Sequence, residues 1–300
     1  MIHNVLNVQT HIQLKNILFA TDFSPAACVA VPYAAMLARR HGAKLYAFHV
    51  RGPAINPMTP PGSWRGLEEA AEMESNQQKR ALLNMFPGLQ PEILINDGDL
   101  WSSLATAVKR HDIDLIVLGT HGRTGMGKFL LGSVAEEIFR QAPCPVLTVG
   151  PHAPTEVEQS SQFTHILLAT DFSPESLAAA SYAVSLAREY QAHLTLLHVV
   201  EETNAGELVS RSELAPPSER LLRNLVPPQA ELRYVPDCVV QYGSAPEGIL
   251  DVAAQRGADL IVLGVRQPHG FPAAASHLAI GTAHKVVSQA PCPVLTVRAL

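Results

Sequence analysis

The sequence has no concentrated positive charge. Its 300 residues contain 22 Lys and Arg against 27 Asp and Glu, which gives a formal net charge of −5, and no basic block occurs. Affinity for the phosphate backbone of nucleic acids is supplied by clustered Lys and Arg, so this composition argues against a general nucleic-acid binder. No nucleic-acid partner is therefore expected.

Long apolar runs are also missing. No stretch approaches the ~20 residues that a membrane-spanning helix needs, and Met1 to Lys15 lacks a cationic region followed by a long apolar core. Nearly half of the residues are nevertheless apolar, which is enough for sizeable cores in two ordinary domains. We expect a soluble, cytoplasmic protein without a membrane partner.

Metal-ligand spacings are absent as well. The four cysteines form no C-x2-C pair, and the 13 histidines include no H-E-x-x-H pattern. A zinc site is therefore not expected, and the cysteines are predicted to be reduced thiols in a cytosolic chain.

The sequence does contain a duplication. Three short segments recur at near-constant separation: 21–25 as 170–174, 114–119 as 259–264, and 142–149 as 290–297. Such a pattern indicates a duplicated domain rather than a short-period repeat. We predict a first domain at 1–150, a proline-containing polar linker at 151–162, and a second domain at 163–300.

Each copy alternates apolar strands with helices. In the first copy the expected strands are 16–20, 44–50, 93–95, 115–118 and 146–149, and the expected helices are 25–40, 67–84, 100–111 and 133–141, with a kink allowed at Pro32. Strands that are continuously apolar are typical of a parallel sheet covered on both faces. The fold class is thus α/β, with two repeated sandwiches whose ligands are expected beyond the carboxyl ends of the strands.

A glycine-rich loop follows the apolar strand 115–118 in the first copy. It reads G-x2-G-x9-G-S, and glycines at a strand exit followed by a helix start let backbone N–H groups approach an anion. The candidate phosphate-binding residues are Gly119, Gly122, Arg123, Lys128, Gly132 and Ser133.

Two other interpretations of this loop remain open, and a third conflicts with its glycine spacing. Gly122 to Lys128 resembles a Walker A loop, but Phe129 stands where that motif needs a Ser or Thr for magnesium. A dinucleotide fingerprint G-x-G-x-x-G does not fit the glycine spacing. The loop could also be a surface loop that binds nothing.

Ala20, Thr21 and Asp22 end the first strand, at the same edge of the sheet as the glycine loop. Asp22 could cap the following helix, since Asp is a favoured N-cap, with Ser24 nearby as another good cap. Alternatively its carboxylate accepts hydrogen bonds from the adenosine part of a nucleotide. Thr21 is more simply structural. Asp171 has the same two interpretations in the second copy.

These segments together resemble the universal stress protein family. The resemblance rests on I-L-x-A-T-D-F-S-P, D-L-I-V-L-G, the glycine motif and A-P-C-P-V-L-T-V, and it covers essentially the whole chain twice. It implies a five-stranded Rossmann-like sheet of order 3-2-1-4-5 and binding of ATP, with or without Mg²⁺. By this resemblance Asp22 contacts the adenosine, the backbone around Val50 the adenine, and the glycine motif the ribose and phosphates.

The second copy departs from the motif. Gln267 stands where the first copy has Gly122, Pro268 removes an N–H donor, and no clear counterpart of Lys128 follows. Its weaker candidate residues are Asp171, Gly264, Gly281 and Thr282. We therefore expect ATP mainly in the first domain.

The resulting function is a regulatory, stress-response ATP-binding module without catalytic residues. A slow ATPase or phosphotransferase is the alternative, as is an interaction scaffold that binds no nucleotide. The closing strands 146–149 and 294–297 are predicted to lie side by side as an intramolecular pseudo-dimer, because each would otherwise leave an apolar sheet edge uncovered. A homodimer of the tandem chain is a further partner to be considered.

Overall fold

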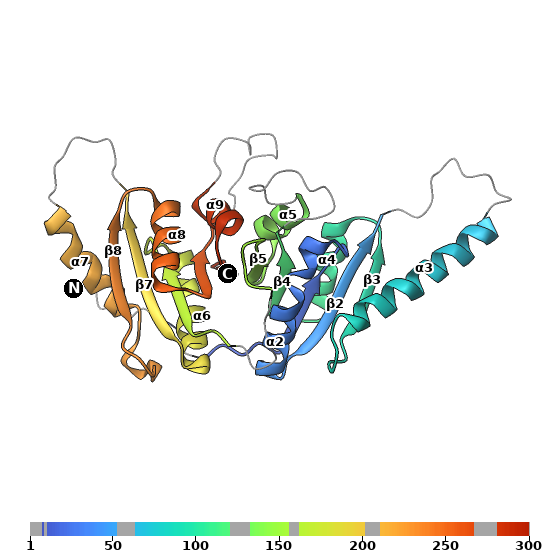
Figure 1. The fold of residues 1–300 in the computed structure, drawn as a ribbon, viewed down its shortest axis with the longest axis horizontal. Coiled ribbons are helices and arrows are strands. Elements are labelled where there is room, and N and C mark those ends of the chain that lie inside the picture. Colours follow the sequence, from blue (N-terminus) through green and yellow to red (C-terminus); the bar gives the residue numbers. More distant parts are fainter. Residues whose placement is uncertain are drawn as a thin grey trace.

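The computed structural model describes residues 8, 11–52, 64–120, 133–155, 162–201, 211–266 and 281–299. For residues 64–69, 133–134, 140 and 211–216 it describes the backbone alone. Within these ranges each half of the chain forms five strands with helices on both sides (Figure 1).

The elements of the first half are β1 (Asn16–Ala20), α1 (Pro25–Cys28), α2 (Val31–His41), β2 (Lys44–Arg51), α3 (Trp64–Asn84), β3 (Glu92–Asp97), α4 (Leu100–Arg110), β4 (Leu115–Gly119), α5 (Ser133–Gln141) and β5 (Val146–Val149). Those of the second half are β6 (His165–Ala169), α6 (Pro174–Tyr190), β7 (His193–Val200), α7 (Arg211–Asn224), a 3-10 turn (Pro228–Ala230), β8 (Asp237–Tyr242), α8 (Ala245–Arg256), β9 (Leu260–Gly264), α9 (Thr282–Gln289) and β10 (Val294–Val297).

The first helical segment differs between the halves. The prediction of one helix over 25–40 is wrong at its centre, since α1 ends at Cys28 and α2 begins at Val31. Pro32 lies in the first turn of α2, where its missing N–H is tolerated, whereas a helix running through it would lose a hydrogen bond. In the second half Ser181 takes the equivalent place, and α6 runs without a break from Pro174 to Tyr190.

All ten strands form one sheet of order β3-β2-β1-β4-β5-β10-β9-β6-β7-β8. Each half therefore has the predicted strand order 3-2-1-4-5, and all strands within a half are parallel. The order in which the strands follow one another along the sheet reverses between β1 and β4 in the first half and between β6 and β9 in the second. The closing strands pair antiparallel, with Leu295 opposite Leu147 and the Thr296 hydroxyl donating to the Val146 carbonyl at 3.2 Å. The predicted side-by-side placement of these strands is confirmed.

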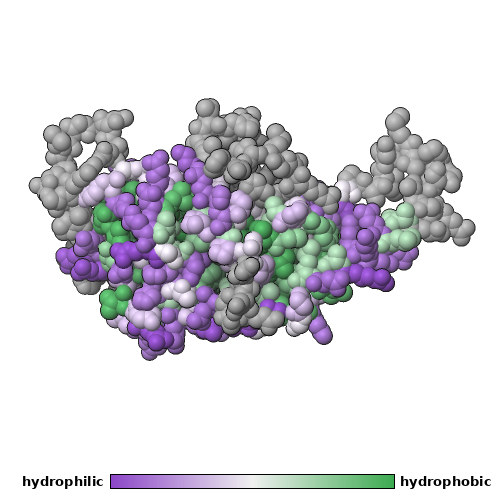
Figure 2. Space-filling model, in the orientation of Figure 1, coloured by the Kyte–Doolittle hydropathy of each residue, from purple (hydrophilic) through white to green (hydrophobic). Residues whose placement is uncertain are grey.

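The sheet is covered by two apolar layers. One packs α2, α3, α6 and α7 against one face, and the other packs α4, α5, α8 and α9 against the opposite face. Each layer contains side chains from both halves of the chain, so the two cores are continuous across the β5–β10 junction. Figure 2 shows that one face of the surface mixes hydrophilic and hydrophobic residues, with hydrophobic ones gathered near the centre of the first half.

Polar contacts also join the halves at the carboxyl end of α2. His41 Nδ1 lies 3.4 Å from a carboxylate oxygen of Glu189, and the Arg40 guanidinium donates to the Glu189 carbonyl and packs over the Tyr190 ring. The His41 side chain is only 5% exposed, and its burial lowers the pKa of the imidazole, against the opposing influence of the Glu189 carboxylate. This histidine is therefore held in its neutral form at the junction.

Among the residues described, no helix has the length and apolar character needed to cross a bilayer.

Candidate functional site

A pocket of about 210 Å³ lies at the carboxyl ends of β1 and β4, where the strand order of the first half reverses. Thr21 and Asp22 line it from the end of β1, Val50 from β2, and Gly119 from the end of β4. Apolar side chains form its walls: Phe48, Leu100, Leu118 and Ile138. This is the place where open parallel sheets bind ligands.

The segment after β1 is fixed by local hydrogen bonds that orient Asp22. Its Oδ1 accepts the N–H of Ser24 at 2.9 Å, and Ser24, not Asp22, caps α1 by accepting the N–H of Ala27. Phe23 between them has a φ of 63°, a left-handed conformation that is uncommon for an aromatic residue. The N-cap interpretation of Asp22 is thus corrected, and its carboxylate lies at the pocket wall.

A buried histidine supports this turn. His49 on β2 donates from Nδ1 to the Thr21 carbonyl at 2.8 Å, and its ring packs edge-to-face on Phe23 with centroids 4.6 Å apart. The second half repeats the arrangement with His198, Thr170 and Phe172. These histidines and phenylalanines were missed by the sequence reasoning, although a signal existed, because His recurs at the same distance after T-D-F in both copies.

Gly119 has a packing reason for being glycine. A Cβ at this position would lie 2.3 Å from the Ala26 carbonyl oxygen and 2.8 Å from the Ala27 Cα, since α1 crosses directly over the end of β4. Gly264 is equally constrained, with the Ser176 backbone nitrogen 2.3 Å from its would-be Cβ. Close approach of a helix to the strand end therefore explains both glycines without a ligand.

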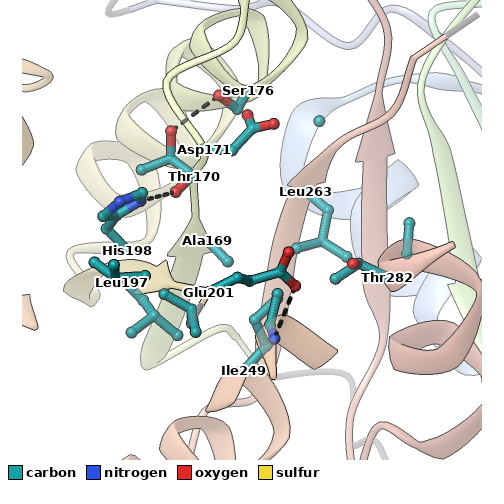
Figure 3. A pocket seen from close by; sticks show the side chains of 15 residues that line it. Ala169, Thr170, Asp171, Ser176, Leu197, His198, Glu201, Ile249, Leu263 and Thr282 are labelled. Atoms are coloured by element: carbon teal, nitrogen blue, oxygen red, sulfur yellow. Dashed lines mark hydrogen bonds between the residues drawn. The ribbon is translucent and has the colours of Figure 1, made fainter. Parts of the chain in front are cut away.

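The second half has a pocket of about 410 Å³ at the equivalent place (Figure 3). Asp171, Gly264 and Thr282 line it, together with Glu201 from the end of β7. The Arg266 guanidinium donates to the Asp171 carboxylate at 3.0 Å. Although burial alone would raise the pKa of Asp171, hydrogen bonds from Ser173 and Ser176 and the Arg266 charge lower it overall.

The model of the universal stress protein family matches this chain twice, over residues 13–150 and 162–298. The chain belongs to the universal stress protein family. Its two domains are tandem copies of the family unit, each built on the pocket-bearing sheet described above.

Known universal stress proteins resemble either one domain or both. A universal stress protein of Methanocaldococcus jannaschii is 31% identical over 139 residues, which are 45% of this chain and 81% of that protein. One of Thermus aquaticus is 32% identical over 136 residues, or 45% of this chain and 98% of that protein. The crystal structure of a universal stress protein from Archaeoglobus fulgidus covers 96% of this chain and 100% of its own, with 20% identity and a TM-score of 0.66, and so shares the tandem fold.

In the first universal stress protein domain, the structure brings five predicted residues to one pocket: Ala20, Thr21, Asp22, Val50 and Gly119. Ser133 begins α5, as predicted, and Ala135 of that helix lines the pocket. The other predicted phosphate-binding residues lie outside the described residues: Gly122, Arg123, Lys128 and Gly132.

In the second universal stress protein domain, Gly281 is the N-cap residue of α9, and a Cβ there would meet nothing within 4 Å. Thr282 begins the helix and faces the pocket, while Gln267 and Pro268 lie outside the described residues. The start of α9 is therefore placed where backbone N–H groups can reach a ligand.

Within the described ranges, no group of three or more His, Cys, Asp or Glu side chains could hold a metal ion. The four cysteines are free thiols, and burial raises the pKa of Cys144 and of Cys292 to about 12. Such thiols stay protonated near neutral pH and are poor nucleophiles.

Proposed function

We propose that this tandem universal stress protein is an ATP-binding regulatory module of the stress response, with ATP held mainly by the first domain. The observation that carries the proposal is the first-domain pocket, because a fixed carboxylate, apolar walls and a helix start meet at the point where the strand order reverses. The carboxylate is oriented before any ligand arrives, since Asp22 is held by the Ser24 N–H.

Each part of the pocket suits one part of ATP. Asp22 accepts hydrogen bonds from the ribose hydroxyls, and the Val50 backbone meets the adenine edge. Phe48, Leu100 and Ile138 give the flat base an apolar slot. The start of α5 provides N–H groups that have no acceptor within the helix and a positive dipole end for phosphates, and the glycines, Arg123 and Lys128 of the preceding loop add to them.

The second domain binds ATP weakly or not at all under this proposal. Its loop lacks a glycine at the position of Gly122 and carries Pro268. The Asp171 carboxylate, which corresponds to Asp22, is already engaged by Arg266. A ribose hydroxyl must therefore compete with a guanidinium for the same oxygen.

A slow ATPase or phosphotransferase is the competing function. Phosphoryl transfer needs magnesium ligands and a group that positions the nucleophile. Asp22 is the one carboxylate among the described residues that line the first pocket. Any Mg²⁺ would therefore have to be held mainly by the phosphates of ATP, and the proposal assigns no catalytic residue.

The test is to identify the nucleotide that the purified protein releases on denaturation, followed by calorimetric titration with ATP with and without Mg²⁺. We expect one ATP per chain at the first domain. Absence of nucleotide and of any heat of binding would support the scaffold interpretation instead. Single-turnover hydrolysis above background would support the enzyme.

A further inference from the structure

The two pockets differ at one structurally equivalent position. The Gly98 N–H donates to the Arg51 carbonyl at the end of β2, and the Gly243 N–H donates to the Val200 carbonyl at the end of β7. The residue that follows each carbonyl therefore occupies the same place, and both line their pocket. That residue is Gly52 in the first domain and Glu201 in the second.

The Glu201 side chain reaches into the second pocket. Its Oε1 accepts the N–H of Ala245 at the start of α8, at 3.3 Å. Figure 3 shows the side chain extending from the end of β7 between Ile249 on one side and Leu263 with Thr282 on the other. The carboxylate thus lines the second pocket at the position where Gly52 lines the first pocket without a side chain.

Side-chain carboxylates accept an N–H at the starts of α4 and α8, but they come from different positions in the two domains. In the first domain Asp99 caps α4 by accepting the Ser102 N–H at 2.8 Å. Ser244, the N-cap residue of α8, makes no side-chain capping hydrogen bond, and the Glu201 carboxylate accepts the Ala245 N–H instead. The α8 N-terminus holds the carboxylate in the pocket, since the positive end of a helix dipole favours an anion.

We propose that the second pocket binds an unphosphorylated nucleoside or its heterocyclic base, and that Glu201 sets this preference. The inference rests on the proposed function, because it takes the two pockets as variants of one nucleotide site. It goes further by giving the second pocket a ligand class of its own.

The chemistry of the carboxylate supports this class. An ionised carboxylate only accepts hydrogen bonds, so it matches a ligand edge with N–H donors. No described residue other than Ala245 donates to the Glu201 carboxylate in a hydrogen bond of the structure, which leaves acceptor capacity for a ligand. The pocket walls of Leu197, Ile249 and Leu263 suit a flat ring.

The same carboxylate opposes a triphosphate. The Glu201 side chain is exposed, so water screens its charge, but a triphosphate bound against it would still meet a like charge, and repulsion of the wrong ligand is a common source of specificity. Arg266 does not offset Glu201, because its guanidinium pairs with Asp171. Adenosine is consequently expected to bind the second pocket about tenfold more tightly than ATP, a modest ratio because water screens the exposed carboxylate.

Calorimetric titration with adenosine and with ATP tests the proposal. The chain carries Asp22→Ala together with Gly132→Val, so that the first site loses both its ribose acceptor and its phosphate space, and is compared with the same chain bearing Glu201→Gln or Glu201→Gly. Glu201→Gln keeps the size and an acceptor oxygen for the Ala245 N–H but removes the charge. Both changes should lower the adenosine preference about tenfold, and Glu201→Gly should admit ATP best.

Glu247→Gln is the matched control, because this exposed carboxylate in the first turn of α8 does not line the pocket. It should leave the adenosine-to-ATP ratio unchanged. The converse change, Gly52→Glu in a chain with an intact first site, should weaken ATP there while adenosine is retained. Thermal melting of every variant separates loss of folding from loss of binding.

An unmodified second pocket that binds ATP as tightly as adenosine, or binds neither, would overturn the proposal. So would an unchanged ratio in both Glu201 variants. If the intact first domain fails to bind ATP, the proposed function is lost, but the adenosine-to-ATP ratio at the second pocket still decides this inference.

Discussion

Gly119→Ala should destabilise the protein because it places one methyl group between a strand end and a helix. The new Cβ would lie 2.3 Å from the Ala26 carbonyl oxygen and 2.8 Å from the Ala27 Cα. Carbon contacts are most favourable at about 3.5–4.0 Å, so α1 would have to retreat by roughly 1 Å. Both neighbours are backbone atoms, which means that no side-chain rotation can relieve the overlap.

The expected cost follows from overpacking of a dense interior. Inserting one carbon into such a site costs about 1–3 kcal/mol, and the backbone neighbours favour the upper half of that range. Gly264→Ala should cost a similar amount, since its Cβ would lie 2.3 Å from the Ser176 nitrogen and 2.4 Å from the Glu175 carbonyl carbon.

Denaturant unfolding followed by circular dichroism measures this effect in the two variants. Gly150→Ala is the matched control at the end of β5, because its Cβ would meet the Val287 carbonyl oxygen at an ordinary 3.5 Å. That change should leave the unfolding midpoint nearly unaltered. If Gly119→Ala and Gly264→Ala behaved like the control, the packing explanation of these glycines would be wrong, and a ligand-contact role would be the better account.

Three further predictions concern ligand binding and pH. Asp22→Ala should weaken ATP binding by about 1–3 kcal/mol through loss of a charged acceptor, with Asp22→Asn less affected, as calorimetry can show. Gly132→Val should abolish most ATP binding by filling the space of the phosphates, whereas Gly281→Val should matter much less; equal losses would refute the asymmetry. Because burial lowers the pKa of His41, its stabilising contribution is complete above the unfolded value of about 6.5 and falls as pH drops through the lowered folded value. His41→Tyr, which copies the equivalent Tyr190, should therefore flatten the pH dependence of the unfolding free energy below about pH 6.5.

The sheet was largely predictable from local sequence. The apolar segments 115–118 and 146–149 fall in β4 and β5, and the duplicated D-L-I-V-L-G places β9 with equal accuracy. The strand order came from the family resemblance, and it holds in both halves. The contact between β5 and β10 could be predicted because an apolar strand at the edge of a sheet is otherwise exposed to solvent and can pair with another edge strand.

The site was less predictable, because its geometry depends on residues far apart in the chain. Thr21 and His49 are 28 positions apart, and only the parallel register of β1 and β2 brings the imidazole under the turn. The placement of Glu201 also depends on distant residues, because its carboxylate contacts the start of α8, which lies beside the end of β7 only in the folded chain. A residue that merely follows a strand in sequence gives no sign that its side chain crosses a pocket.

The antiparallel junction of β5 and β10 lies within a single polypeptide. An interface between separate molecules dissolves on dilution, but an intramolecular one has an effective concentration set by the chain itself. Association of the two halves is therefore independent of the amount of protein in solution. The two pockets therefore occur in a one-to-one ratio, because each chain carries both domains. A partner that binds both pockets would contact them on the same side of the molecule, where β2 and β7 end (Figure 1).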